Sequence, residues 1–188
     1  VIWAAIGPTG DITIYDEWPN FEFNKAKDPN YGVPEYAEVF KTKEFRIKGR
    51  PIQRILDRHF GNARRTLGGL TLKQEFSEVG IDFMDSYTIA EIGAEVETGI
   101  LKVKDALRYN DKKPIDALNQ PKLRVTDNCI NTIHALERWS RDPKSGKPKD
   151  EYKDGADVVR YLVMSNPEVC KLVDWNIEAL SYGVNNTP

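Results

Sequence analysis

The stretch from Tyr152 to Met164 (YKDGADVVRYLVM) constrains the fold more than any other part of the chain. At about 100° per residue, its Val, Leu and Ala side chains form one broad apolar arc, which predicts a helix packed on a core. Asp154, Asp157 and Tyr161 share a narrow strip beside that arc. Carboxylates at the edge of a buried face are costly unless a cation or donors compensate for lost water. The alternative is a solvated acidic edge near a helix N-terminus, where Asp also favours the dipole.

The rest of the chain predicts strands mixed with helices, which is typical of an α/β fold. Strands are expected at residues 1–6 and 12–18 as a hairpin, then at 52–56, 81–84 and 123–126. Helices are expected at 35–48, at 72–79 behind a Thr71 cap, at 89–107, and after a cap at Asp127 or Asn128. The strand at 52–56 would deliver Asp57 to its carboxyl end, where sites assemble in open α/β sheets.

Size and composition favour one domain, residues 1–165, followed by a C-terminal appendage, residues 166–188. No apolar run approaches the ~20 residues of a membrane helix, so we expect no membrane partner. Cys129 and Cys170 are too few for a disulfide scaffold, and with His59 and His134 they make a structural zinc site a poor expectation. A phosphate-binding G-x-x-x-x-G-K-[ST] loop is absent from this sequence.

Charge is distributed unevenly along the chain. Residues 41–73 carry ten basic and two acidic side chains, a net charge of +8, whereas the whole chain has a formal charge of −2. Such a basic segment in an acidic protein favours a polyanion as partner; a solvated, Lys/Arg-rich surface is the alternative. The candidate DNA-binding residues are Arg54, Arg58, Arg64, Arg65, Lys73, Lys102 and Lys104, although basic residues near a helix end, such as the last two, also favour the dipole without a ligand.

Four short motifs occur along the chain in an order that matches a known protein family. They are Arg54-Ile55-Leu56-Asp57, the run 72–81 (LKQEFSEVGI), the run 128–133 (NCINTI), and Asp157-Val158-Val159-Arg160-Tyr161. The last resembles the D-A-x-R-Y ending of the nuclease domain of tailed-phage terminase large subunits, and the match spans roughly residues 1–165. The resemblance implies a ribonuclease H-like fold, with a mixed central sheet flanked by helices. It also implies an endonuclease that cuts concatemeric double-stranded DNA with Mg²⁺ or Mn²⁺.

Hydrolysis of a phosphodiester by two hard cations requires several carboxylates that converge from different elements. We therefore expect Asp57 and Asp157 to be catalytic and to bind metal. Asp154 is expected to be a further metal ligand, because it occupies the position where the family often has His. A second departure is Arg58, which follows Asp57 where the family usually has Pro. By the family pattern the first catalytic Asp lies upstream of Val1; Asp11, Asp16 or Glu17 would be the substitutes.

The resemblance also implies partners. These are double-stranded DNA, an ATPase domain upstream in the same polypeptide, the portal protein and a small terminase subunit, with the enzyme in the host cytoplasm and transiently docked on the procapsid. Two alternatives remain. One is another ribonuclease H-like nuclease, of the Holliday-junction resolvase type; the other is a non-catalytic DNA-binding or docking module.

Overall fold

The computed structural model describes residues 1–20, 31–47, 50, 52–64, 69–84 and 96–169. Its centre is a mixed sheet in the order β1-β2-β3, formed by β1 (Ile2–Ile6), β2 (Ile12–Glu17) and β3 (Leu123–Val125). β1 and β2 are antiparallel with a shift in register between Trp3 and Ala4, and β3 runs parallel to β2. The α/β class, the N-terminal hairpin and the short strand near residue 123 are therefore confirmed.

Helices form the other regular elements of the described residues. They are α1 (Val33–Glu44), the short 3-10 helix η1 (Phe45–Ile47), α2 (Arg58–Gly61), α3 (Leu72–Glu78), α5 (Val96–Ala106), α6 (Ile130–Arg138) and α7 (Lys153–Met164). Among these described helices, none combines the length with the apolar character that crossing a membrane requires.

Side-chain acceptors at the first turn explain where helices α3 and α6 begin. The Thr71 hydroxyl accepts a bond from the Gln74 amide at 3.2 Å, and the Gln74 side chain accepts one from the Thr71 amide at 2.8 Å. This reciprocal capping box confirms the predicted start of α3. The predicted cap of α6 is wrong: α6 starts after Cys129, which makes no side-chain cap bond. The acceptor comes from β2 instead, because the Glu17 carboxylate receives the amides of Asn131 and Thr132.

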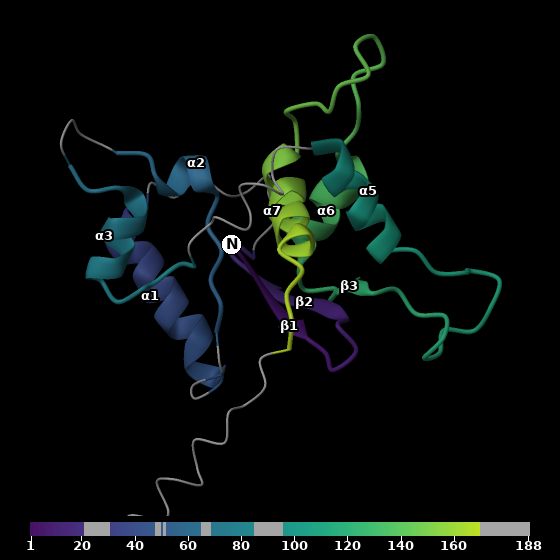
Figure 1. The fold of residues 1–188 in the computed structure, drawn as a ribbon, viewed down its shortest axis with the longest axis horizontal. Coiled ribbons are helices and arrows are strands. Elements are labelled where there is room, and N and C mark those ends of the chain that lie inside the picture. The colour runs from purple at the N-terminus through teal and green to yellow at the C-terminus, as the bar shows by residue number, and fades with distance from the viewer. Residues whose placement is uncertain (21–30, 48–49, 51, 65–68, 85–95, 170–188) are drawn as a thin grey trace, which may run out of the picture.

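The core has two parts, one on each side of the sheet region (Figure 1). The first part joins Trp3 of β1 to Phe40 of α1, Phe76 of α3 and Phe83, with the aromatic rings packed edge to face. The second part consists of Ile12, Ile14, Val103, Leu123, Cys129 and Val159. Helix α7 contributes Val159, which is fully buried, so the predicted apolar arc packs as expected.

Two predicted strands are wrong. Residues 52–57 and 81–84 are described but adopt no strand, and the backbone bond between the two segments runs from the Met84 amide to the Arg54 carbonyl at 2.9 Å. Their apolar side chains, such as Ile81 and Phe83, pack on α1 and α3 in the first core cluster rather than alternating across the sheet. Part of the predicted helix 89–107 and most of the appendage, residues 170–188, lie outside the described residues.

Candidate functional site

Helix α7 presents a charged pair at the edge of its buried face. Arg160 is 3% exposed, and its Nε donates to Asp157 Oδ1 at 2.9 Å, one turn earlier on the helix. The guanidinium carbon of Arg160 also lies 4.6 Å from the centre of the Tyr161 ring. Because a buried guanidinium needs an anion to offset its lost hydration, Asp157 is the counterion that compensates the buried charge of Arg160.

Asp57 reaches the same helix from a distant part of the chain. It precedes α2, where its Oδ1 accepts the Phe60 amide at 2.8 Å in the manner of an N-cap. Its carboxylate is also a hydrogen-bond partner of the Tyr161 phenol. Burial of the phenol, this hydrogen bond and the charges of Asp57 and Asp157 together raise the pKa of Tyr161 to about 12. Both predicted catalytic carboxylates thus act on a single side chain, and Figure 1 shows α7 between α2 on one side and α5 and α6 on the other.

The third predicted ligand does not complete a set. Asp154 is exposed, in the first turn of α7. Within the described residues, no three His, Cys, Asp or Glu side chains gather in a group that could hold a metal ion. The structure therefore associates Asp57 with Asp157 through Tyr161, and it leaves Asp154 outside this arrangement.

The donor chemistry of Asp57 and Asp157 suits a hard divalent cation, which prefers carboxylate oxygen. In each carboxylate Oδ1 accepts one bond, from Phe60 in Asp57 and from Arg160 in Asp157. Carboxylates that bind metals are commonly held in this way by a second hydrogen bond. Two such groups fit part of a cation site and leave further positions for water, phosphate oxygen or another acid.

The three acids expected as possible substitutes for the first catalytic Asp of the family pattern all have other partners. Asp11 pairs with Arg124, and Asp16 pairs with Lys43 at 2.7 Å. Glu17 is 2% exposed and accepts three bonds from the start of α6: the Asn131 amide at 2.7 Å, the Thr132 amide at 2.8 Å and the Thr132 hydroxyl at 2.7 Å. Their contacts give each of these acids a structural role.

The predicted DNA-binding residues fall into different environments. Arg54 donates from Nε to Glu44 at 3.0 Å and pairs again through its terminal nitrogen, and Glu44 is itself buried. This interaction gives Arg54 a role in joining its segment to α1. Arg64 is exposed beside α2, and its backbone bridges to Thr71 at the start of α3. The side chain of Arg58 and the whole of Arg65 lie outside the described residues.

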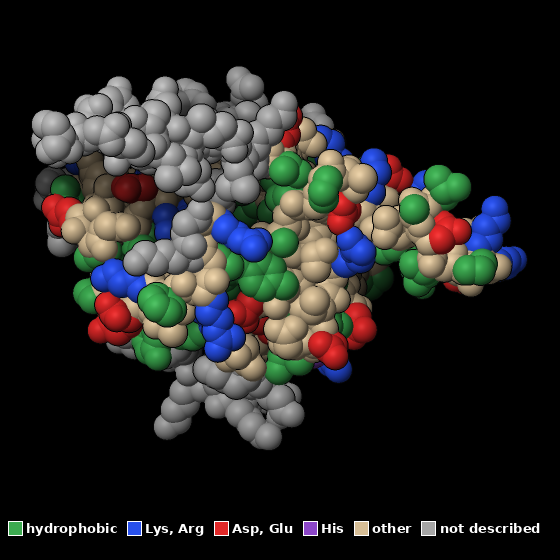
Figure 2. Space-filling model, turned by 90° about the horizontal axis from the view of Figure 1, so that it is seen from below, with side chains coloured by type: hydrophobic (Ala, Val, Ile, Leu, Met, Phe, Trp, Pro, Cys, Tyr) green, Lys and Arg blue, Asp and Glu red, His purple; other side chains and the backbone are tan. Residues whose placement is uncertain are grey.

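The three predicted lysines lie on two separate helices. Lys73 is on α3 and donates to the Met84 carbonyl at 3.3 Å. Lys102 and Lys104 are exposed on α5, the helix that packs against α7 on the other side. Figure 2 shows one face of the molecule, on which Lys and Arg side chains alternate with Asp and Glu. The face in that view is mixed in charge.

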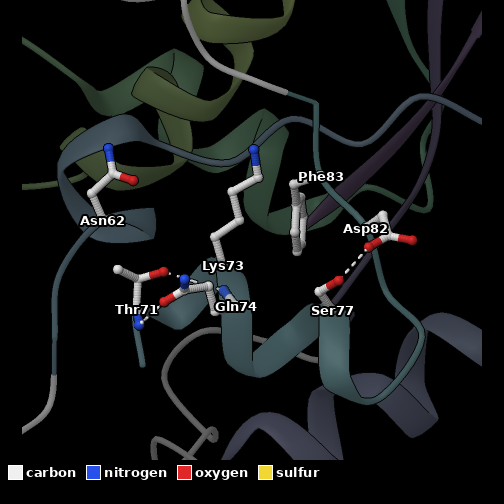
Figure 3. A pocket seen from close by; sticks show the side chains of 7 residues that line it. All are labelled: Asn62, Thr71, Lys73, Gln74, Ser77, Asp82 and Phe83. Carbon is white, nitrogen blue, oxygen red and sulfur yellow. Dashed lines mark hydrogen bonds between the residues drawn. The ribbon is translucent and has the colours of Figure 1, made fainter. Parts of the chain in front are cut away.

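A hollow of about 370 Å³ lies between α3 and the segment 81–84. It is lined by Asn62, Thr71, Lys73, Gln74, Ser77, Asp82 and Phe83. Figure 3 shows Lys73 extending between Asn62 and Phe83, while the Ser77 hydroxyl donates to Asp82 at 2.6 Å. The exposed Arg64 lies next to this hollow in the structure, because its backbone bridges to Thr71, one of the lining residues. A phosphate chain crossing this part of the surface would meet Lys73 and Arg64 together with neutral amide and hydroxyl groups.

Sequence reasoning assigned no role to Arg160 or Gly99. A Cβ atom added to Gly99 of α5 would lie 2.5 Å from Arg160 Cδ and 2.6 Å from Cγ, so only glycine leaves space for the buried arginine. The signal available in the sequence was an arginine on the apolar side of a helix, three residues after an aspartate. Comparison with family models, with curated proteins and with solved structures finds no match, so the site rests on the geometry of this chain.

Proposed function

We propose that this chain is the ribonuclease H-like nuclease domain of a phage terminase large subunit, a divalent-metal-dependent endonuclease that cuts concatemeric double-stranded DNA. The observation that carries the proposal is that Asp57, as a hydrogen-bond partner, and Asp157, through its charge, both act on the Tyr161 phenol. The two acids come from segments that are distant in the sequence, and each is held by its own donor. A nuclease of this class needs such convergence.

In this proposal Asp57 and Asp157 hold Mg²⁺ or Mn²⁺. When bound, the two-cation site would supply a water nucleophile at neutral pH and neutralise the charge that develops on the phosphodiester. The protein's own contribution is to fix the two carboxylates. Asp57 is tied to the start of α2 and to α7, and Asp157 is tied to a buried arginine. The family pattern includes one further acid, on a strand that precedes the hairpin.

Sequence-tolerant binding of the duplex would come from two basic side chains, the exposed Arg64 and the half-buried Lys73. Arg64 and Lys73 lie close to α2 and α3, on the same side of α7 as Asp57. Contacts to phosphate position a duplex without reading its bases, which suits an enzyme that cuts where a packaging motor stops. The partners in this proposal are the upstream ATPase domain, the portal protein and the small terminase subunit.

The test is cleavage of supercoiled plasmid by the chain extended upstream through its native sequence, with Mn²⁺ or with EDTA. We expect metal-dependent nicking and linearisation that disappears in Asp57→Asn and in Asp157→Asn. Asp105→Asn is the matched control, since Asp105 is an exposed acid on α5 that pairs only with Arg108 among the contacts of the described residues. Full cleavage by both active-site variants would overturn the proposal.

A non-catalytic DNA-binding module is the second candidate, and one observation favours it. Each of the two acids already has a structural partner, because Asp57 caps α2 and Asp157 neutralises Arg160. Under this alternative, the upstream-extended chain binds duplex DNA with salt-dependent affinity but does not nick it at any Mn²⁺ concentration. The plasmid assay run beside a binding assay separates the two functions.

A further inference from the structure

We propose that Arg160 is a positioning residue that fixes the Asp157 carboxylate for a divalent cation, from a space that Gly99 keeps open. The inference rests on the proposed metal-dependent function and assigns a role within that site to two residues that do not touch the cation. Its basis is the set of contacts around the guanidinium, which hold both the arginine and the carboxylate in place.

The first contact orients the carboxylate. Arg160 Nε donates to Asp157 Oδ1 at 2.9 Å, and the two side chains are 3% and 14% exposed. Because one donor holds one oxygen, the rotation of the carboxylate is restricted and Oδ2 is left for another ligand. A hydrogen bond of this kind orients a metal ligand and usually affects metal affinity strongly.

The second set of contacts fixes the arginine itself. Its guanidinium lies over the Tyr161 ring with 4.6 Å between the guanidinium carbon and the ring centre. Its aliphatic stem fills the space at Gly99, where an added Cβ would overlap Cγ and Cδ. Tyr161 also contacts Asp57, so the same ring links the arginine to the second carboxylate.

The third observation is an unpaired atom. Arg160 Nη1 is buried and has no hydrogen-bond partner among the described residues. A buried donor without a partner costs stability, and an apolar side chain of similar length would fill the same space without that loss. The arginine is therefore poorly explained by packing, whereas its bond to Asp157 explains it directly.

Charge and positioning predict opposite results, which makes the inference testable. If Arg160 were only a nearby positive charge, its removal would strengthen binding of a divalent cation through reduced repulsion. If Arg160 positions Asp157, its removal weakens binding even though the repulsion is gone. Arg160→Lys sharpens the contrast, because it keeps the charge and loses the planar group that donates through Nε and stacks on Tyr161.

The experiment is thermal melting of the full 188-residue chain across a Mn²⁺ titration, which yields an apparent dissociation constant from the concentration dependence. We expect that constant to rise by roughly 10–100-fold in Arg160→Met and Arg160→Lys. Gly99→Ala, which displaces the arginine without deleting it, should show a rise in the same direction. At saturating Mn²⁺ the metal-induced shift should return in all three variants. Arg108→Met, which removes a side chain that is 76% exposed just after α5, should leave the constant unchanged.

The outcomes separate this inference from the proposed function. If the parent melts identically with and without Mn²⁺, the positioning role is overturned, and plasmid cleavage by the upstream-extended chain then decides the metal-dependent function separately. If the parent responds but Arg160→Lys and Gly99→Ala bind Mn²⁺ as the parent does, or if Arg160→Met binds it more tightly, the function stands and the positioning role is overturned. Should Arg160→Met not fold, the other two variants decide the question.

Discussion

Replacement of Glu17 by Gln should destabilise the protein more than any other single change of charge in the sheet. Glu17 is 2% exposed, and both of its oxygens accept bonds from the start of α6: Oε1 from the Asn131 amide and Oε2 from the amide and hydroxyl of Thr132. A glutamine can accept through one oxygen only. Its NH₂ group would then face an amide that also donates, so at least one buried backbone donor loses its acceptor.

The size of this effect follows from the contacts that are lost. An unsatisfied buried donor costs about 1–3 kcal/mol, and removing a negative charge from a helix N-terminus costs up to about 1 kcal/mol more in an ordinary site. We therefore expect Glu17→Gln to lower the free energy of unfolding by about 2–4 kcal/mol. For a chain of this length that corresponds to a fall in Tm of roughly 5–15 °C.

The assay is urea unfolding followed by circular dichroism, with a parallel thermal melt. Glu38→Gln is the matched control, because it makes the same chemical change at a side chain that is 73% exposed and that pairs with Lys41 on the surface of α1. We expect the control to lie within about 0.5 kcal/mol of the parent. Equal stabilities for Glu17→Gln and Glu38→Gln would refute the assignment of Glu17 as the acceptor that anchors α6 to β2.

Three further predictions test other parts of the structure. Gly155→Ala should lower the free energy of unfolding by about 1–3 kcal/mol in denaturant melts, because the new Cβ would lie 2.6 Å from Ala135 Cβ of α6. This loss should exceed the gain from the better helix propensity of alanine. A stabilised variant would show that α6 and α7 are not packed this closely. The pKa of Tyr161 in the folded protein is about 12, above its ordinary value of 10.0, so its contribution to stability is present below pH 10 and is lost as the pH rises through 12. The difference in melting temperature between the parent and Tyr161→Phe should therefore be constant below pH 10 and change above it. A difference that stays constant up to pH 12 would contradict this. Arg64→Glu should weaken binding of unrelated duplexes about equally and flatten the salt dependence, whereas identical slopes for Arg64→Glu and the parent in a fluorescence anisotropy titration would show that this side chain does not meet phosphate.

The features predicted correctly from sequence are those set by neighbouring residues. The hairpin at the start of the chain, the cap at Thr71 and the apolar face of α7 depend on turn residues, a capping box and helical periodicity. The Asp157–Arg160 pair is also local, because side chains three residues apart meet on one side of a helix, but it was not predicted. Sequence reasoning placed Asp157 at the edge of the core without recognising that Arg160 lies inside it.

The features that sequence reasoning missed depend on tertiary partners. Residues 52–57 have the composition of a strand, but a strand needs a ladder of backbone bonds, and this segment has one such bond to 81–84 in the described structure. The contact between Tyr161 and Asp57 joins distant segments, so no local spacing could reveal it. The role of Gly99 is likewise visible only when α5 is packed against α7.

The central claim is that Asp57 and Asp157 together form a cation site, and the most direct test is the melting temperature of the 188-residue chain with and without Mn²⁺. A ligand of the native state at 100 times its dissociation constant stabilises by about 2.7 kcal/mol. We predict that the parent gains stability with Mn²⁺ and that Asp157→Asn gains none, although Asp157→Asn also melts lower in EDTA because buried Arg160 loses its counterion. If Asp157→Asn retains the Mn²⁺-induced rise of the parent, Asp157 does not bind the cation and the account of this site is wrong.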